Sequence, residues 1–138
     1  MRPPTQPERI AIIGSPRAGK TTLAHALAAE LRLPMASSDE LIRLGWQEVS
    51  IEVARLLKAG PGIFEGVAVV RALRRLIIEL PLHVRPCERC IVLTEPRLVL
   101  TLGQNAMRKA CATVLREIQP EMLRRGVVLE VDPPVVQQ

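Results

Sequence analysis

The stretch from Gly14 to Thr21 reads Gly-Ser-Pro-Arg-Ala-Gly-Lys-Thr, the spacing G-x-x-x-x-G-K-[ST] of a phosphate-binding loop. The glycines let the backbone wrap tightly enough for its N–H groups to point at phosphate oxygens, and the next helix adds the partial positive charge of its N-terminus. We expect Lys20 to reach the β- and γ-phosphates and the Thr21 hydroxyl to hold Mg²⁺. The sequence therefore predicts a site for ATP and Mg²⁺ whose cofactor-binding residues are Gly14, Ser15, Pro16, Arg17, Ala18, Gly19, Lys20, Thr21 and Thr22.

The segments on either side of this loop have the patterns that the motif requires. Residues 10–13 form a continuous apolar run, typical of a strand buried on both faces. Residues 19–31 follow as a helix, whose expected buried positions are Leu23, Ala26, Leu27, Ala28 and Leu31. In this arrangement we expect the Lys20 side chain to lie at the surface of the loop and Arg17 to face nucleotide or solvent.

The rest of the chain alternates short apolar runs with helical patterns. Further strands are expected at 33–37, 63–64, 90–93 and 127–131. A helix capped by Ser37 or Ser38 is expected to begin near Asp39, and a longer helix follows that ends at Gly60-Pro61-Gly62. Further helices are expected from 67 to 80 and up to about 125, where Pro120 could divide or kink the last one. This alternation predicts an α/β fold with right-handed crossovers and a five-stranded parallel sheet between helical layers. We expect a flexible leader at 1–8, one domain at 9–131 and a tail at 132–138.

Two acidic residues follow expected strands, at the sheet edge where ligands collect. Asp39 could orient or deprotonate a phosphate acceptor, although a helix N-terminus favours an aspartate for purely structural reasons. Glu65 precedes Gly66 and could hold Mg²⁺ through water or contact substrate; otherwise it is a solvated turn residue. Asp39 and Glu65 join Lys20 as candidate catalytic residues, and Thr21 and Glu65 are the candidate metal residues.

Arginines on two expected helices could neutralise the charge that develops during phosphoryl transfer. One group contains Arg71, Arg74 and Arg75, and the other contains Arg108, Lys109 and Arg116. A charged helix face is more often simply solvated, so we expect one member of each group to act, and Arg71 and Arg108 complete the catalytic candidates.

Composition narrows the possible partners. Nineteen basic and fourteen acidic residues give a net charge of +5, which suits anionic ligands. With one Trp, one Phe and no Tyr, the chain lacks the aromatics of a surface that stacks single-stranded bases, so nucleic acid is not an expected partner. The sequence has no candidate transmembrane run and no signal-peptide pattern, so we expect no membrane contact and a cytoplasmic location.

Cys87-x-x-Cys90 with His83 resembles part of a metal site, but four ligands are needed. The other cysteine, Cys111, falls on the apolar face of an expected helix. Packing is therefore the better interpretation of these cysteines.

The order of the phosphate loop, Asp39, Glu65-Gly66, then Arg71 and Arg74 resembles small P-loop kinases of the nucleoside-monophosphate-kinase-like group. The resemblance spans about residues 9–131, and only the phosphate loop is motif-specific. It implies the strand order 2-3-1-4-5, ATP with Mg²⁺, an acceptor pocket between the second and third strand ends, and lid arginines such as Arg97, Arg108 or Lys109. Adenylate kinases carry Asp-Gly-Phe-Pro-Arg after the third strand, where this chain has Glu-Gly-Val-Ala-Val.

The leading hypothesis is a phosphotransferase that moves the γ-phosphate of ATP to a small acceptor such as a nucleoside or nucleotide. The alternative is a nucleotide-dependent ATPase module that regulates a protein partner. A GTPase is disfavoured because neither an Asn-Lys-x-Asp run nor an Asp-x-x-Gly switch run occurs. The sequence specifies neither the acceptor nor the oligomeric state.

Overall fold

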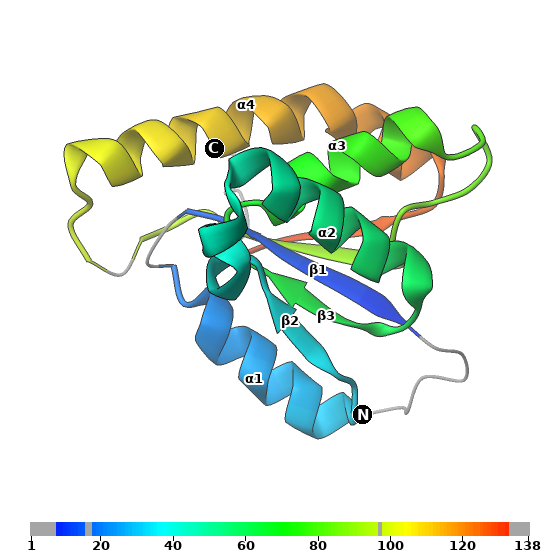
Figure 1. Cartoon of the computed structure of the whole chain (residues 1–138), viewed down its shortest axis with the longest axis horizontal. Helices are drawn as coiled ribbons and strands as arrows, with labels where there is room; N and C mark the ends of the chain where they lie inside the picture. Colours follow the sequence, from blue (N-terminus) through cyan, green and yellow to red (C-terminus); the bar gives the residue numbers. More distant parts are fainter. Residues whose placement is uncertain (1–7, 16–17, 97, 133–138) are drawn as a thin grey trace, which may run out of the picture.

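The computed structural model describes residues 8–15, 18–96 and 98–132, and for residues 42–44 and 46 it describes the backbone alone. Along the chain the elements are β1 (Arg9–Gly14), α1 (Lys20–Leu31), β2 (Met35–Ser37), the 3₁₀ helix η1 (Ser38–Leu44), α2 (Trp46–Ala59), β3 (Gly62–Glu65), α3 (Val69–Glu79), β4 (Arg89–Leu93), α4 (Leu102–Arg124) and β5 (Val128–Asp132). The strands form one five-stranded sheet in the order β2-β3-β1-β4-β5, and all neighbours are parallel (Figure 1). Both the parallel sheet and its strand order are confirmed.

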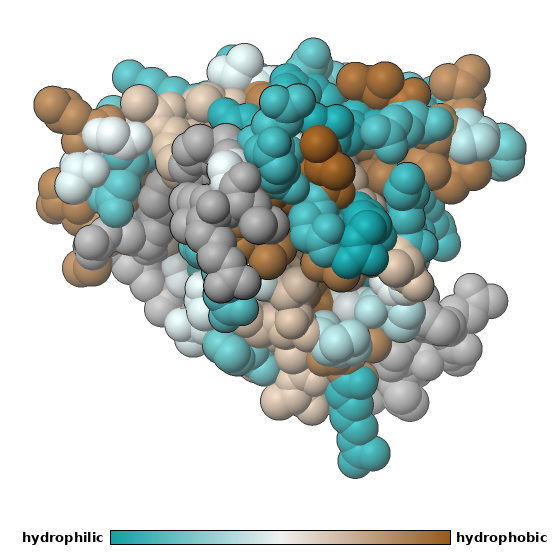
Figure 2. Space-filling view, viewed as in Figure 1, coloured by the Kyte–Doolittle hydropathy of each residue, from teal (hydrophilic) through white to brown (hydrophobic). Residues whose placement is uncertain are grey.

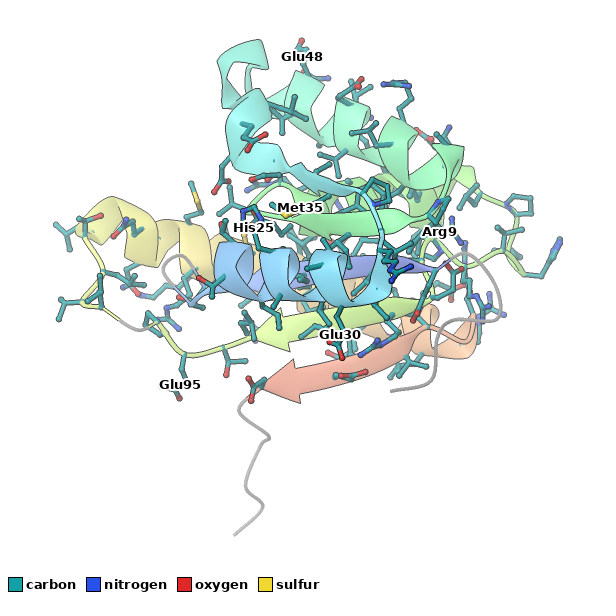
Figure 3. All side chains as sticks on the ribbon, turned by 90° about the horizontal axis from the view of Figure 1, so that it is seen from below. Arg9, His25, Glu30, Met35, Glu48 and Glu95 are labelled. Carbon is teal, nitrogen blue, oxygen red and sulfur yellow. The ribbon has the colours of Figure 1, made fainter. Side chains whose placement is uncertain are left out.

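Helices cover both faces of the sheet, so the fold has three layers. α1 lies across one face, and α2, α3 and α4 lie on the other (Figures 1 and 3). Alternate residues of a strand point to opposite faces. In β1, Ile10 and Ile12 pack against α1, while Ala11 and Ile13 join the core under the other helices. The uninterrupted apolar run of β1 is the result of burial on both faces.

The buried face of α1 differs from the expected one at one position. Ala24 has no exposed surface, whereas Ala26 is exposed. Residues two apart on a helix point about 200° away from each other, so only one of these alanines can face the sheet. The assignment of Ala26 to the buried face is therefore wrong, while Leu23, Leu27, Ala28 and Leu31 pack against the sheet as expected.

Two helices follow β2, a short one beside Asp39 and a longer one that ends before Gly60, as expected. A 3₁₀ helix occupies 38–44, and α2 begins only after Gly45, whose φ of 93° is a left-handed conformation that favours glycine. The Ser38 hydroxyl accepts a hydrogen bond from the Ala68 N–H at 3.2 Å. Ser38 is the first residue of η1, and its hydroxyl joins this segment to the start of α3.

α4 runs unbroken through Pro120. Its N-terminus carries a capping box, in which Thr101 and Gln104 each accept from the other's backbone N–H. Pro120 lies on the exposed side, so the expected division of the helix there is wrong. Although α4 is 23 residues long, no helix in the described part of the chain is both long and apolar enough to cross a membrane.

Large exposed hydrophobic side chains gather at two places in the helical layer. Leu98, Val99 and Leu102 lie at the segment that enters α4, and Ile78 and Leu82 lie near the end of α3. Brown side chains are visible at both ends of this layer in Figure 2. The first group therefore adjoins the carboxyl edge of the sheet, where α4 begins.

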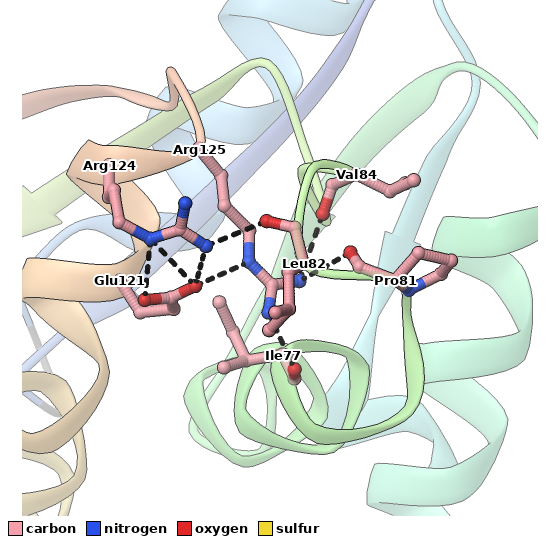
Figure 4. Close-up of polar contacts among 7 residues, drawn as sticks. All are labelled: Ile77, Pro81, Leu82, Val84, Glu121, Arg124 and Arg125. Carbon is pink, nitrogen blue, oxygen red and sulfur yellow. Dashed lines mark hydrogen bonds and ion pairs between the residues drawn. The ribbon is translucent and has the colours of Figure 1, made fainter.

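At the other edge, buried Arg125 ties α4 to the chain that follows α3 (Figure 4). Its guanidinium donates to the carbonyl oxygens of Ile77 at 2.9 Å, Val84 at 3.0 Å and Pro81 at 3.3 Å. Its Nε also donates to Glu121 at 3.0 Å. The side chain is only 1% exposed, so these partners replace water around its charge.

Candidate active site

The carboxyl ends of β1 and β3 bring Glu65 to the phosphate loop. Glu65 is paired with Ile12 in the sheet, two residues before Gly14. Its side chain has no exposed surface, and the Thr21 hydroxyl donates to its Oε1 at 3.1 Å. The other oxygen, Oε2, is buried and has no hydrogen-bond partner among the described residues. A buried carboxyl oxygen without a partner is costly, which indicates that it faces a ligand site.

This arrangement fits Mg²⁺, which prefers oxygen ligands and usually keeps several waters. The Thr21 hydroxyl and the Glu65 carboxylate lie next to each other at the start of α1. In the described part of the chain, no group of three or more His, Cys, Asp and Glu side chains forms a metal cage. A metal here would therefore be held by these two residues together with water and phosphate oxygens.

Lys20 is buried, not at the surface of the loop as expected. It is 6% exposed, and its ammonium donates to the Ser15 carbonyl oxygen at 2.8 Å. Burial lowers the pKa of Lys20, and the charges of Asp39 and Glu65 oppose that shift. The expectation was wrong because the Lys20 side chain folds back to the Ser15 carbonyl oxygen at the end of β1.

Glycine is required where the loop leaves β1. Gly14 has a φ of +135°, and a Cβ there would lie 2.0 Å from the Leu93 carbonyl oxygen. The next N–H, that of Ser15, donates to the same oxygen at 2.9 Å. Gly19 takes a φ of 88° directly before α1. These two glycines therefore shape the loop by close approach and by backbone conformation.

Gly66 has the same role behind Glu65. Its φ is +126°, and an added Cβ would lie 2.0 Å from the Ser38 hydroxyl oxygen. The same hydroxyl holds the Ala68 N–H. The ends of β2 and β3 are thus locked together, which fixes Asp39 relative to Glu65. Sequence reasoning missed Ser38 in this role, although its place beside Asp39 was the available signal.

Asp39 is exposed in the first turn of η1. Burial lowers the pKa of Lys20, and the negative charge of Asp39 offsets part of that lowering, so the two groups interact across the site. The structure therefore brings Lys20, Thr21, Asp39 and Glu65 to one edge of the sheet. Asp39 is the exposed carboxylate of the site, which suits contact with an acceptor.

The two arginine candidates lie on different helices beside this edge. Arg71 is half-buried in the first turn of α3 and makes no hydrogen bond or ion pair with any residue in the described ranges. Arg108 donates from Nε and Nη2 to the Asn105 Oδ1, at 3.1 and 2.9 Å. It lines a cavity of about 160 Å³ together with Gly14 and Ser15. Pro16 and Arg17 of the loop, and Arg97 of the expected lid, lie outside the described residues.

The cysteines are packed in the core. Cys87 and Cys90 lie in the cluster under α2, α3 and α4, and burial raises the pKa of Cys90 to about 12. Cys111 donates to the Val67 carbonyl oxygen at 3.5 Å. Burial raises its pKa, while the charges of Arg71 and Lys20 act in the opposite direction. Arg71 and Lys20 therefore both lie close enough to the Cys111 thiol for their charges to affect its pKa.

Known proteins share this architecture without sharing much sequence. No protein-family profile matches the sequence, and no curated protein matches it significantly. A solved shikimate kinase from Acinetobacter baumannii, in complex with shikimate, has a TM-score of 0.56 at 18% identity, over 96% of this chain and 86% of that one. A shikimate kinase from Bacteroides thetaiotaomicron has a TM-score of 0.47 at 15% identity, over 89% and 85%. The chain therefore shares the fold of the Acinetobacter kinase.

In this fold, the residues described above occupy the edge at which open parallel sheets bind ligands. The phosphate loop follows β1, η1 follows β2, and α3 follows β3. The site residues therefore come from the ends of three neighbouring strands, and α4 adds Arg108 from the side.

Proposed function

We propose that this protein is an ATP-dependent phosphotransferase that moves the γ-phosphate of ATP to a small-molecule acceptor. The observation that carries the proposal is the orphaned Glu65 Oε2, buried beside the Thr21 hydroxyl. A buried carboxyl with one oxygen satisfied by the loop and one unpaired is costly unless it has a ligand.

The phosphate loop would hold the triphosphate through its backbone N–H groups. Lys20 is restrained by one carbonyl oxygen, that of Ser15, which a phosphate oxygen would replace as its partner. Thr21 and Glu65 would hold Mg²⁺, which neutralises phosphate charge when bound. Because Lys20 is already buried, its charge acts there with little screening by water.

On the acceptor side, Asp39 would accept the proton of the attacking hydroxyl or orient it. It is the exposed carboxylate of the site, and the contact between Ser38 and Ala68 fixes its segment. Arg71 and Arg108 would neutralise the charge on the migrating group. The similar Acinetobacter structure is a kinase in complex with shikimate, a small molecule, which supports an acceptor of that size.

Labelled ATP tests the proposal. The protein is incubated with γ-labelled ATP, Mg²⁺ and panels of nucleosides, nucleotides, sugars and hydroxy acids, and transferred label is measured. We expect acceptor-dependent transfer, which Thr21→Ala abolishes. Thr113→Ala is the matched control, because Thr113 is an exposed threonine on α4.

Two results would contradict the proposal. Release of inorganic phosphate that no acceptor changes would favour the ATPase alternative. Tight binding of ATP with neither transfer nor hydrolysis would leave a nucleotide-binding protein without catalysis.

A further inference from the structure

A groove of about 740 Å³ lies on the outward side of α3, between α2 and α4. α3 packs against both of these helices and forms the floor of the groove (Figure 1). The described residues that line it come from these three helices alone, and none belongs to the phosphate loop or is Asp39 or Glu65. The groove is therefore a second surface, separate from the residues that would bind ATP and Mg²⁺.

The floor of the groove is basic. Its residues share one face of α3 at helical spacing and are Arg71, Arg74, Arg75 and Ile78. Arg74 pairs with Glu117 through an exposed contact of 3.2 Å. Arg75 donates from Nε to the Ser50 hydroxyl at 3.1 Å, and its Nη atoms donate to no described residue. The described lining contains no acidic side chain, so the floor offers cationic donors that the protein does not use.

The wall that α4 contributes is small and apolar. Its members lie on one side of the helix and are Gly103, Ala106, Met107 and Ala110. A Cβ added to Gly103 would meet no atom within 4 Å, so this end of the wall is open. Small side chains at a contact let two helices approach closely. The wall therefore suits another helix laid beside α4.

Exposed hydrophobic side chains extend this surface beyond both ends of the groove. Ile78 lines the groove, and Leu82 follows it past the end of α3. At the other end, exposed Leu102 directly precedes Gly103 (Figure 2). The floor alone is about 10 Å long from Arg71 to Ile78, or two helical turns. Exposed apolar side chains grouped in this way are typical of a surface that binds another protein.

Charge distinguishes between the possible occupants of the groove. A second copy of the chain would bring a further net charge of +5 to a basic surface, which opposes self-association. A nucleic acid backbone would require cations along the α4 wall, which is apolar. A helix with acidic side chains on one side and apolar side chains on the other complements both the floor and the wall.

We propose that this groove binds an amphipathic helix of another protein. The acidic side chains of that helix pair with Arg74 and Arg75, and its apolar side chains pack on Ile78 and against the α4 wall. Glu117 pairs with Arg74 in the unbound protein, and a carboxylate of the partner replaces it. This docking site goes beyond the proposed function, and its test requires no ATP.

A display selection tests which class of partner binds. Two libraries are selected on the wild-type protein, one with a randomised face on a small helical scaffold and one of linear peptides. Each round includes counter-selection on Gly103→Trp protein. We expect enrichment from the helical library of sequences in which Asp or Glu flanks apolar positions spaced three and four residues apart. No enrichment, enrichment from the linear library only, or enriched helices without acidic positions would overturn the inference.

Variants then locate the selected helix on the protein. Arg74→Gln with Arg75→Gln, and separately Gly103→Trp, should weaken its binding about ten-fold or more, because they remove the cations or fill the open end of the groove. Arg55→Gln is the control for the first, since Arg55 is exposed and pairs with a glutamate elsewhere on α2. Ala29→Trp is the control for the second, on an exposed position of α1. Thermal unfolding checks that each variant is folded, and binding that both groove variants retain would overturn the inference.

Two further measurements give results of opposite sign or of a different kind. Glu117→Gln should tighten binding of the selected helix up to about five-fold, because it removes an exposed ion pair that competes for Arg74. Weaker binding in this variant would contradict the proposed pairing. Light scattering should give the same oligomeric state for the wild type and Gly103→Trp. A dimer that Gly103→Trp dissociates would show that a second copy occupies the groove, and would overturn the inference.

Discussion

The two edges of the sheet hold their charges in different ways. At the amino edge, Arg9 donates to both carboxyl oxygens of Glu88, at 2.9 and 2.7 Å. Arg125 is surrounded by three carbonyl oxygens and Glu121 (Figure 4). At the carboxyl edge, within the described residues, Lys20 donates to one carbonyl oxygen and Glu65 Oε2 has no hydrogen-bond partner. Arg9 and Glu95 mark these opposite ends in Figure 3.

The difference separates charges that stabilise the fold from charges that await a ligand. A buried charge with all its hydrogen bonds made is expensive to remove, because its partners lose their contacts as well. A buried charge with bonds missing costs stability, and its retention indicates a function. Substitutions at the two edges should therefore have opposite signatures, one in stability and the other in activity.

The largest expected effect on activity comes from Lys20→Met. Removing a buried, preorganised cation should lower phosphoryl transfer by about 10² to 10³-fold. The free energy of unfolding should stay the same or rise, because burial already disfavours this ammonium, as its lowered pKa shows. Transfer kinetics and urea unfolding test this pair of results. A large loss of stability would place Lys20 with the structural charges instead.

Arg125→Met should show the converse. The substitution leaves three carbonyl oxygens and Glu121 without their buried donor, which should lower the free energy of unfolding by roughly 2–4 kcal/mol. ATP affinity per folded molecule should not change, since Arg125 precedes β5 at the far edge. Arg124→Met is the control, because Arg124 is 54% exposed and a solvent-exposed ion pair such as that with Glu121 contributes little to stability. Equal effects of the two variants would show that burial does not distinguish them.

Glu65→Gln separates the two roles within one residue. Glutamine has the same shape but lacks the charge, so Mg²⁺-dependent ATP affinity should fall about ten-fold or more. The free energy of unfolding should change by less than about 1 kcal/mol, because the lost charge was incompletely bonded. Calorimetry with and without Mg²⁺ measures the affinity, and Glu95→Gln at the same edge is an exposed control. Unchanged affinity would remove Glu65 from the metal site.

The same contrast explains how much the sequence could predict. The sheet and the phosphate loop could be predicted, because they depend on local patterns: the apolar runs of β1 and β4 and the motif from Gly14 to Thr21. The carbonyl partners of Arg125 lie 41 to 48 residues away along the chain, and no spacing rule connects them.

Close packing contacts could not be predicted from the sequence either. Gly66 reads as an ordinary turn glycine, and its contact with Ser38 exists only because β2 and β3 are neighbours in the sheet. Lys20 was expected at the surface because a motif specifies residue types and not the path of the side chain.

The smallest expected effect is a pH dependence confined to the amino edge. Arg124 and Arg125 lower the pKa of Glu121 from its ordinary 4.5 to about 2. A carboxyl with a lowered pKa stabilises the folded state fully above its ordinary pKa, and that stabilisation is lost as the pH falls through the folded value. Stability should therefore decline between about pH 5 and pH 2, and Glu121→Gln should flatten this decline. Thermal unfolding of both proteins across that range measures it, with Glu95→Gln as the exposed control. If the stability of the wild type and of Glu121→Gln fell equally with pH, the ionisation of Glu121 would not contribute to stability. The contrast between the amino and carboxyl edges would then rest on hydrogen bonding alone.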